Sequence, residues 1–150
     1  MAPSDEFIDS PLHPALLAAY RATDYLVTDL KCVLRVGESC PILEAHLAGE
    51  SSRTAAFITA SNPGSVRLAD EDNQQRNLTL RDRIQALGFT RVYAGEGRGR
   101  DGQWPAESSV LILGISRSVA DGLANEFEQA AYLWYAGGSA SLVICQGASS

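Results

Sequence analysis

Carboxamide side chains gather around the end of one apolar run and the helix predicted to follow it. Residues 57–67 read FITASNPGSVR, so the run ends in a cluster of Ser, Asn, Pro and Gly. Asn73 and Asn77 stand four residues apart in a segment of helical pattern, which places both on one side of that helix. A helix that packs back on its strand starts beside the strand's carboxyl end, where α/β proteins collect ligands. We therefore expect both amides to converge with Asn62 and Arg76.

Two interpretations of this amide cluster are open. In the first, which we favour, the amides hold the backbone of a long loop, because an inward-facing Asn must satisfy several donors and acceptors. In the second, they bind a polar or anionic small molecule together with the free N–H groups at the helix start. The pocket of the second interpretation is built by Thr59, Asn62, Asn73, Asn77 and Glu107, with Arg76 offering positive charge.

A second polar segment covers residues 95–109 and begins GEGRGRDGQWP. Its glycine spacing matches a phosphate-binding loop only superficially, because no helix follows the third glycine. We interpret it as a surface loop anchored by Trp104, and the alternative is a mobile lid whose tryptophan stacks on a ligand. Glu96 and Glu107 end one predicted strand and begin the next, so antiparallel pairing could join their carboxylates for acid–base chemistry. Exposed carboxylates at strand ends are commoner. Glu96 and Trp104 complete the predicted ligand-binding residues.

No set of residues marks a catalytic nucleophile or a metal site. Thr59, Ser61 and Cys145 carry nucleophilic groups. Neither His13 nor His46 stands in a context that marks it as their base. The three cysteines have no C-x-x-C spacing, and we interpret them as buried, reduced thiols. Catalytic residues are therefore unassigned, and neither a metal nor a cofactor is expected.

The elements that position these residues alternate along the chain. Helices are predicted at 14–22, 41–49, 71–87 and 116–127, and strands at 25–36 (one bent or two short), 55–60, 89–94, 110–115, 131–136 and 140–146. The last two strands flank Gly137-Gly138-Ser139, which indicates a terminal hairpin. We predict a single α/β or α+β domain over residues 1–150, with flexible tails at 1–10 and 147–150. Its sheet is expected to be mixed, with about five or six strands and helices packed on it.

Composition narrows the classes of function. The 150 residues are 45% hydrophobic and carry a net charge of −6, a balance that suits one globular domain and repels phosphate backbones. Nucleic acid is therefore not an expected partner. No apolar run approaches the roughly 20 residues that cross a bilayer, and the N-terminus lacks the pattern of a secretory signal. We expect a cytoplasmic protein with no membrane partner.

The predicted C-terminal hairpin supports a different function. Tyr132, Trp134 and Tyr135 cannot all face one core, and aromatic side chains are enriched at protein interfaces. A sheet covered on both faces explains them equally well. The alternative to a small-molecule binding domain is thus a protein-interaction or accessory module, with a protein partner or a homodimer through this hairpin.

Several stretches together resemble one known family. They are FITASNPGS, the stretch from Asn73 to Asn77, GEGRGRDGQWP with the Glu-Ser that follows, LILGISR and FEQAAYLW. In this combination the sequence resembles a bacterial family of uncharacterised proteins, domain of unknown function 3293, over nearly the whole chain. The resemblance implies a small soluble domain without an assigned activity. The family pattern often has an aromatic at Ser61, a second acidic residue at Ala106, and Gly-Gln-Asn at residues 128–130.

Overall fold

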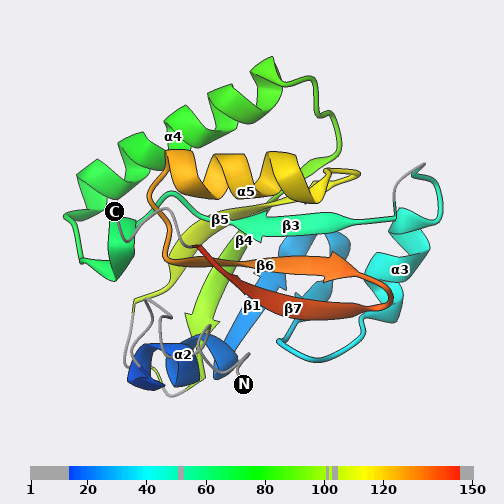
Figure 1. The fold of residues 1–150 in the computed structure, drawn as a ribbon, viewed down its shortest axis with the longest axis horizontal. Helices are drawn as coiled ribbons and strands as arrows, with labels where there is room; N and C mark the ends of the chain where they lie inside the picture. The colour runs from blue at the N-terminus through cyan, green and yellow to red at the C-terminus, as the bar shows by residue number, and fades with distance from the viewer. Residues whose placement is uncertain (1–13, 51–52, 101, 103–104, 146–150) are drawn as a thin grey trace, which may run out of the picture.

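Within the described residues, 14–50, 53–100, 102 and 105–145, the computed structural model has one seven-stranded sheet and four α-helices (Figure 1). The helices are α2 (Pro14–Arg21), α3 (Pro41–Leu47), α4 (Asp70–Ala86) and α5 (Arg117–Glu126). The strands are β1 (Thr23–Val27), β2 (Cys32–Leu34), β3 (Ala55–Ile58), β4 (Val92–Gly99), β5 (Glu107–Leu113), β6 (Ala131–Ala136) and β7 (Ser139–Ile144). Two 3₁₀ turns, η1 (Thr28–Leu30) and η2 (Pro63–Ser65), interrupt the loops. The predicted tails lie outside the described residues.

The sheet is antiparallel throughout, with the strand order β2-β1-β4-β5-β3-β6-β7. The α+β class and the C-terminal hairpin are confirmed. The sheet has more strands than predicted, because residues 25–36 form two strands, and it is not mixed. The positions of the helical connections explain why the sheet is not mixed. β3 and β4 point the same way but are separated by β5, and β5 and β6 point the same way but are separated by β3.

This β3-α4-β4-β5-α5-β6 arrangement is the split β-α-β pattern of ferredoxin-like folds. The chain extends it with β1 and β2 on the β4 side and with β7 on the β6 side. The alternation of strands and helices led us to expect parallel strands side by side. In the structure, an antiparallel strand lies between the two strands of each parallel pair.

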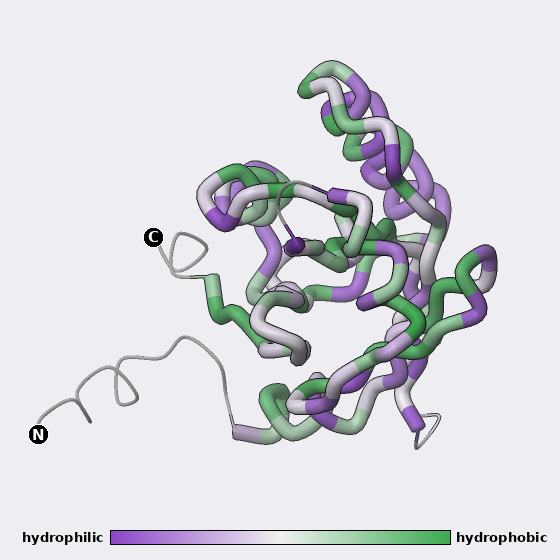
Figure 2. The backbone as a smooth tube through the Cα atoms, turned by 90° about the vertical axis from the view of Figure 1, so that its right-hand side faces the viewer, coloured by the Kyte–Doolittle hydropathy of each residue, from purple (hydrophilic) through white to green (hydrophobic). Residues whose placement is uncertain are grey.

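Helices α4 and α5 cover one face of the sheet (Figure 1). Leu80 and Ile84 of α4 pack with Leu123 of α5 on the sheet residues Ile58 and Ile112, and all five are buried. The rest of α4 is mostly hydrophilic (Figure 2), so the apolar residues at this four-residue spacing fix which side of the helix faces the sheet. None of the helices in the described part of the chain has the length and apolarity to cross a bilayer.

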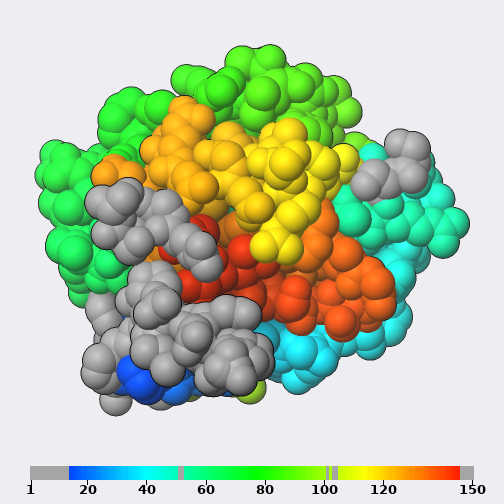
Figure 3. All heavy atoms as spheres, viewed as in Figure 1, coloured from blue at the N-terminus to red at the C-terminus, as the bar shows by residue number. Residues whose placement is uncertain are grey.

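The other face of the sheet curls around a second core. Tyr25, Leu34, Leu111 and Tyr135 meet there with Leu43 of α3. Figure 3 shows α3 beside the β6–β7 hairpin, where the Tyr135 hydroxyl accepts from the N–H of Cys40 at 3.0 Å. The two ends of the sheet also approach each other. The N–H of Gly37, just after β2, donates to Ala140 O in β7 at 2.7 Å, and Ala140 N–H donates to Glu38 O at 3.0 Å.

Strand β4 extends through the segment that the sequence predicted to be a loop. Gly95, Gly97 and Gly99 alternate with charged residues, so the glycines share the concave face of the sheet. A Cβ atom on Gly95 would lie 2.5 Å from the Phe57 ring and 3.0 Å from the Leu26 carbonyl oxygen. The glycines therefore make room for the aromatic rings of the concave core, and the resemblance to a phosphate loop has no structural counterpart.

The hairpin aromatics are divided between the two cores. Tyr135 belongs to the concave core, whereas Tyr132 is buried on the α5 side and Trp134 packs partly buried beside it. The sheet is therefore covered on both faces, which is one of the two explanations that the sequence allowed, and this accounts for all three aromatic side chains.

Candidate functional site

Two amides of α4 hold the loop between β3 and α4. Asn77 Oδ1 accepts from Ala60 N–H at 2.9 Å, and Asn73 Oδ1 accepts from Asn62 N–H at 2.8 Å. Asn77 Nδ2 donates to the Ser61 hydroxyl at 2.9 Å. The predicted convergence of these residues is present, and the contacts are those of the first interpretation, in which the amides satisfy the loop backbone.

Arg76 also connects backbone segments. Its Nε donates to Ala60 O at 2.7 Å, and its Nη2 donates to Phe127 O at 2.5 Å. Its Nη1 lies 3.5 Å from Glu128 Oε1. The guanidinium thus ties the β3–α4 loop to the α5–β6 connection, and it lines neither of the hollows described below.

Asn62 joins the loop to β5. Its backbone is left-handed, with φ 50°, and its Oδ1 accepts from Leu68 N–H at 2.9 Å and from Asn73 Nδ2 at 2.8 Å. Its Nδ2 donates to Glu107 Oε2 at 2.6 Å. The loop amides therefore orient Asn62, and Asn62 orients the Glu107 carboxylate.

Backbone strain concentrates at this junction. Three of the four non-glycine residues with positive φ among the described residues are Asn62, Ser65 (φ 65°) and Glu128 (φ 58°). The N–H of Gly64 donates to Glu128 O at 2.6 Å, which brings the two strained segments together. Left-handed backbone in residues other than glycine is costly, and it clusters where a fold builds binding sites.

A cavity of about 110 Å³ opens on the concave face of the sheet, beneath α2. We call it the α2 cavity. Its lining comes from α2, from every strand except β2, and from the loops after β3, β4 and α5. The polar side chains that line it belong to Tyr20, Thr23, Tyr25, Thr59, Ser61, Asn62, Ser65, Glu107, Ser109 and Gln129. Phe57, Leu16, Leu133 and Leu142 contribute apolar surface.

Among the described residues, Glu107 is the only charged one in this lining. Burial raises the pKa of its carboxyl group, and the hydrogen bond from Asn62 opposes that shift. Oε2 accepts the Asn62 amide, whereas no described residue donates to Oε1. The cavity wall therefore contains a half-buried carboxylate with one oxygen left for a further donor.

Gln129 presents a second acceptor. Its side chain is only 3% exposed, and its Nε2 donates to Ser61 O at 3.1 Å and to Phe127 O at 3.3 Å. Because both partners are carbonyl oxygens, the amide nitrogen must face them, and the amide oxygen must point elsewhere. No hydrogen bond from a described residue reaches that oxygen.

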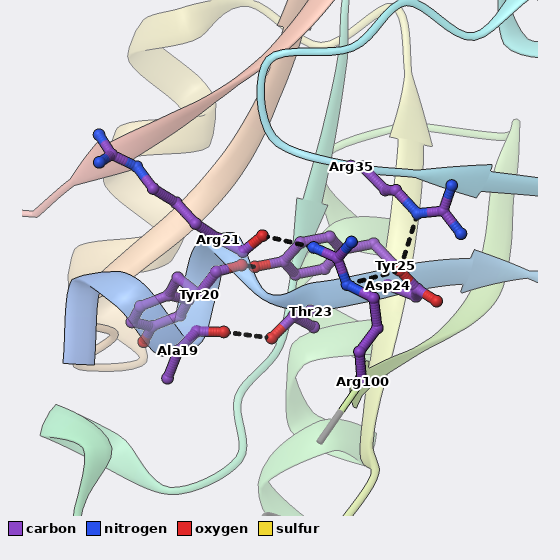
Figure 4. Close-up of polar contacts among 8 residues, drawn as sticks. All are labelled: Ala19, Tyr20, Arg21, Thr23, Asp24, Tyr25, Arg35 and Arg100. Carbon is purple, nitrogen blue, oxygen red and sulfur yellow. Dashed lines mark hydrogen bonds and ion pairs between the residues drawn. The ribbon is translucent and has the colours of Figure 1, made fainter. Parts of the chain in front are cut away.

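Helix α2 is fixed to β1 and β4 through its last carbonyl groups (Figure 4). Thr23 Oγ1 donates to Ala19 O at 2.7 Å, the Tyr25 hydroxyl donates to Tyr20 O at 2.9 Å, and Arg100 Nη2 donates to Arg21 O at 2.7 Å. These bonds satisfy carbonyls that a helix end leaves free. Burial raises the pKa values of both tyrosines, so their hydroxyls stay protonated at neutral pH.

A larger hollow, about 590 Å³, lies between the first half of α4 and strands β4 and β5. We call it the α4 groove. Asn73, Asn77 and the exposed Arg81 line it, and Asn62 and Glu107 line both this groove and the α2 cavity. The Asn62–Glu107 contact thus lies at the boundary between the two hollows.

The predicted site residues separate into three groups. Thr59, Asn62 and Glu107 line the α2 cavity. Asn73, Asn77 and Arg76 support the loop that forms its edge. Glu96 lies elsewhere and forms an ion pair with Arg98, whose Nε donates to its carboxylate at 2.9 Å. Trp104 lies outside the described residues.

The predicted carboxylate pair does not form. The β4–β5 register sets Glu107 opposite Gly97 and Glu96 opposite Ser108. Residues directly opposite each other face the same side of a sheet, and neighbours along a strand face opposite sides. Glu107 therefore faces the concave interior, and Glu96 faces the other way.

Sequence reasoning missed Tyr20, Tyr25, Phe57 and Gln129 as cavity residues. Their signals were weak, because an aromatic in an apolar pattern is indistinguishable from a core residue until the curl of the sheet is known. One signal was available: glycines at every second position of residues 95–99 indicate a strand that another group approaches closely.

Comparisons with known proteins identify a family and give no activity. Neither the curated proteins nor the solved structures contain a match to this chain. A family described as "Protein of unknown function (DUF3293)" matches residues 58–132, which is half of the 150-residue chain. The matched segment runs from the end of β3 into β6 and contains Asn62, Glu107 and Gln129. The chain therefore belongs to the DUF3293 family of proteins of unknown function.

Proposed function

We propose that this protein is a small-molecule binding domain and that the α2 cavity is its binding site. The observation that carries the proposal is the state of Glu107, a half-buried carboxylate in the cavity wall that has a donor to Oε2 and no described donor to Oε1. Partial burial makes the ionised form of this carboxylate less favourable than it would be in water, which is why its pKa is raised. A bound molecule that donates to it would offset this cost of burial.

Two further features support the proposal. The strained residues Asn62 and Ser65 line the cavity, Glu128 directly precedes the lining residue Gln129, and the α4 amides hold the loop after β3 in place. Side chains of α4 thus fix the conformation of the β3–α4 loop. Binding loops are commonly held in this way by a rigid scaffold.

The size and charge of the cavity restrict the ligand. An apolar cavity of about 150 Å³ holds benzene, so about 110 Å³ accommodates a smaller molecule or one end of a longer one. The anionic part of the expected ligand class finds no support, because no Arg, Lys or His in the described part of the chain lines the cavity and Glu107 would repel an anion. We retain the polar ligand, and a cytoplasmic location, as parts of this proposal.

Fragment screening by backbone amide NMR tests the proposal. Fragments of low molecular weight are expected to shift the amides of Ser61, Gln129 and Ala131 and to leave α3 unchanged. Glu107→Gln should weaken these shifts, whereas the matched variant Glu96→Gln, on the opposite face of the neighbouring strand, should leave them unchanged.

A second variant separates binding in the cavity from binding on the surface. The Cβ of Gly97 would meet no atom closer than 3.8 Å, so Gly97→Val has room for its Cβ and places two methyl groups in the space that a ligand would occupy. It should abolish the shifts. The proposal fails if no fragment perturbs the cavity amides, or if fragments bind Gly97→Val as well as the natural protein.

The aromatic residues of the β6–β7 hairpin do not support the alternative function, a protein-interaction module. Tyr132 and Tyr135 are 3% and 1% exposed, so they are not available to a partner. The observation that suggested an interaction surface is explained by the two cores.

A further inference from the structure

The hydrogen-bonding groups around the α2 cavity define the chemical class of its ligand, provided that the cavity is the binding site proposed above. Glu107 Oε1 and Gln129 Oε1 are acceptors without a described donor. The Tyr20 hydroxyl is only loosely engaged, because its oxygen lies 3.4 Å from Ser65 Oγ. Among the neighbouring hydroxyl groups, those of Thr59 and Ser109 already donate within the protein.

Thr59 and Ser109 illustrate this pairing. Thr59 Oγ1 donates to Ser108 O at 2.6 Å and accepts from Ser61 N–H at 3.0 Å. Ser109 Oγ donates to Glu107 O at 3.2 Å. The cavity is therefore rich in free acceptors, and a ligand that fits it must bring donors.

We infer that the α2 cavity binds the ammonium group of a small primary amine, with Glu107 Oε1 as its ionic partner and Gln129 Oε1 as its second acceptor. A primary ammonium has three N–H donors and no acceptor, and the cavity offers two free acceptors and the Tyr20 hydroxyl oxygen. A charged donor is favoured over a neutral one because hydrogen bonds between ionised partners are about twice as strong as neutral ones.

The remaining lining suits the carbon chain of such a ligand. Phe57 and Tyr25 pack edge to face, with ring centroids 5.3 Å apart, and Leu133 and Leu142 extend the apolar wall. The volume of about 110 Å³ admits a chain of a few carbon atoms. No cationic side chain lines the cavity, so nothing in the described protein already neutralises Glu107.

Three ligands of one shape test this inference: n-propylamine, n-propanol and propionate. Each is titrated into isotope-labelled protein at pH 7.5 and constant ionic strength, and the shifts of the Ser61, Gln129 and Ala131 amides are followed. Ligands this small bind at about millimolar concentration, which amide NMR measures directly. Propylamine is expected to bind about tenfold more tightly than propanol, and propionate more weakly than either.

Variants show whether Glu107 is responsible. In Glu107→Gln the preference for propylamine over propanol should fall from about tenfold to about onefold. The matched variant Glu96→Gln should keep it, because that carboxylate lies on the other face of the sheet. A preference that survives Glu107→Gln overturns the inference, since it would arise from general attraction of amines to an acidic surface.

The failures of the two proposals differ in what is observed. If propanol or propionate shifts the cavity amides as strongly as propylamine, the cavity binds small molecules and the amine inference is wrong. If none of the three ligands shifts those amides, the amine inference fails, and an unproductive fragment screen would then remove the proposed binding function as well.

Discussion

Gly95 provides a test of the concave core that requires no ligand. A methyl group at this position would lie 2.5 Å from Cε2 and 2.9 Å from Cζ of Phe57, and 3.0 Å from the Leu26 carbonyl oxygen. The Phe57 ring is buried and packs against Tyr25, and the carbonyl belongs to the β1 backbone, so neither moves away freely. Overpacking of this kind costs about 1–3 kcal/mol, offset by about 0.5–1 kcal/mol because Ala suits a strand better than Gly.

Gly97 is the matched control, two residues along the same face of β4. Its added methyl would be 3.8 Å from the nearest atom, so Gly97→Ala should be neutral or stabilise by about 0.5 kcal/mol. We expect Gly95→Ala to be about 2 kcal/mol less stable than Gly97→Ala, which corresponds to a Tm difference of about 4–8 °C for a chain of this length.

Urea denaturation followed by circular dichroism measures both variants, with equal m-values as the condition for comparing them. A double-mutant cycle with Phe57→Leu identifies the source of the cost, because a smaller side chain should relieve part of the clash at Gly95. Equal stability of Gly95→Ala and Gly97→Ala would refute the account of the glycine alternation and of the close packing behind the cavity.

Three further perturbations follow from the contacts. Asn77→Ala removes the acceptor of the N–H of Ala60, a buried residue, and should lower the free energy of unfolding by about 1–3 kcal/mol in urea titrations, whereas Gln74→Ala on the same helix should change it little. Tyr135→Phe leaves the buried Cys40 N–H without its acceptor and removes the 2.6 Å bond to Glu44, and should cost about 1–3 kcal/mol by the same measurement. Glu107 binds its proton more tightly in the folded than in the unfolded chain, so its contribution to stability falls as pH rises from its ordinary pKa of 4.5 through its raised folded pKa. Glu107→Gln should therefore raise the Tm at pH 7, and by more than it does at pH 4. If the Tm difference between the variant and the natural protein is the same at both pH values, burial does not raise the pKa of this carboxyl group.

The elements with strong local signals could be predicted from the sequence. Helix α4 was expected at residues 71–87 and spans Asp70–Ala86, because its apolar residues recur at helical spacing and Gly88 follows with φ 94°. The loop contacts of Asn73 and Asn77 were also predictable, because an amide facing inward beside a long loop has few partners other than that loop. Leu87 continues the apolar spacing of Leu80 and Ile84, but it is 40% exposed because it lies beyond the last helical residue.

The α2 cavity could not be predicted, because its described lining comes from α2, six strands and three loops. Its position depends on the register of β4 against β5 and on the curl of the sheet, neither of which is set by a local pattern. A shift of one residue in that register would exchange Glu107 for a neighbour and move the carboxylate to the other face. The prediction of a loop from Gly95 onward was wrong because glycine-rich segments usually form turns, whereas these glycines lie within β4.

The contact of Gly37 and Glu38 with Ala140 has a consequence for self-association. A free outer strand offers a row of unpaired N–H and C=O groups to another chain, and proteins avoid aggregation by blocking such templates. At Ala140 both backbone groups of β7 are already bonded within the molecule, and at the far end β2 is only three residues long. The curl that encloses the concave core therefore also shortens the edges at which two copies of the chain could join strand to strand.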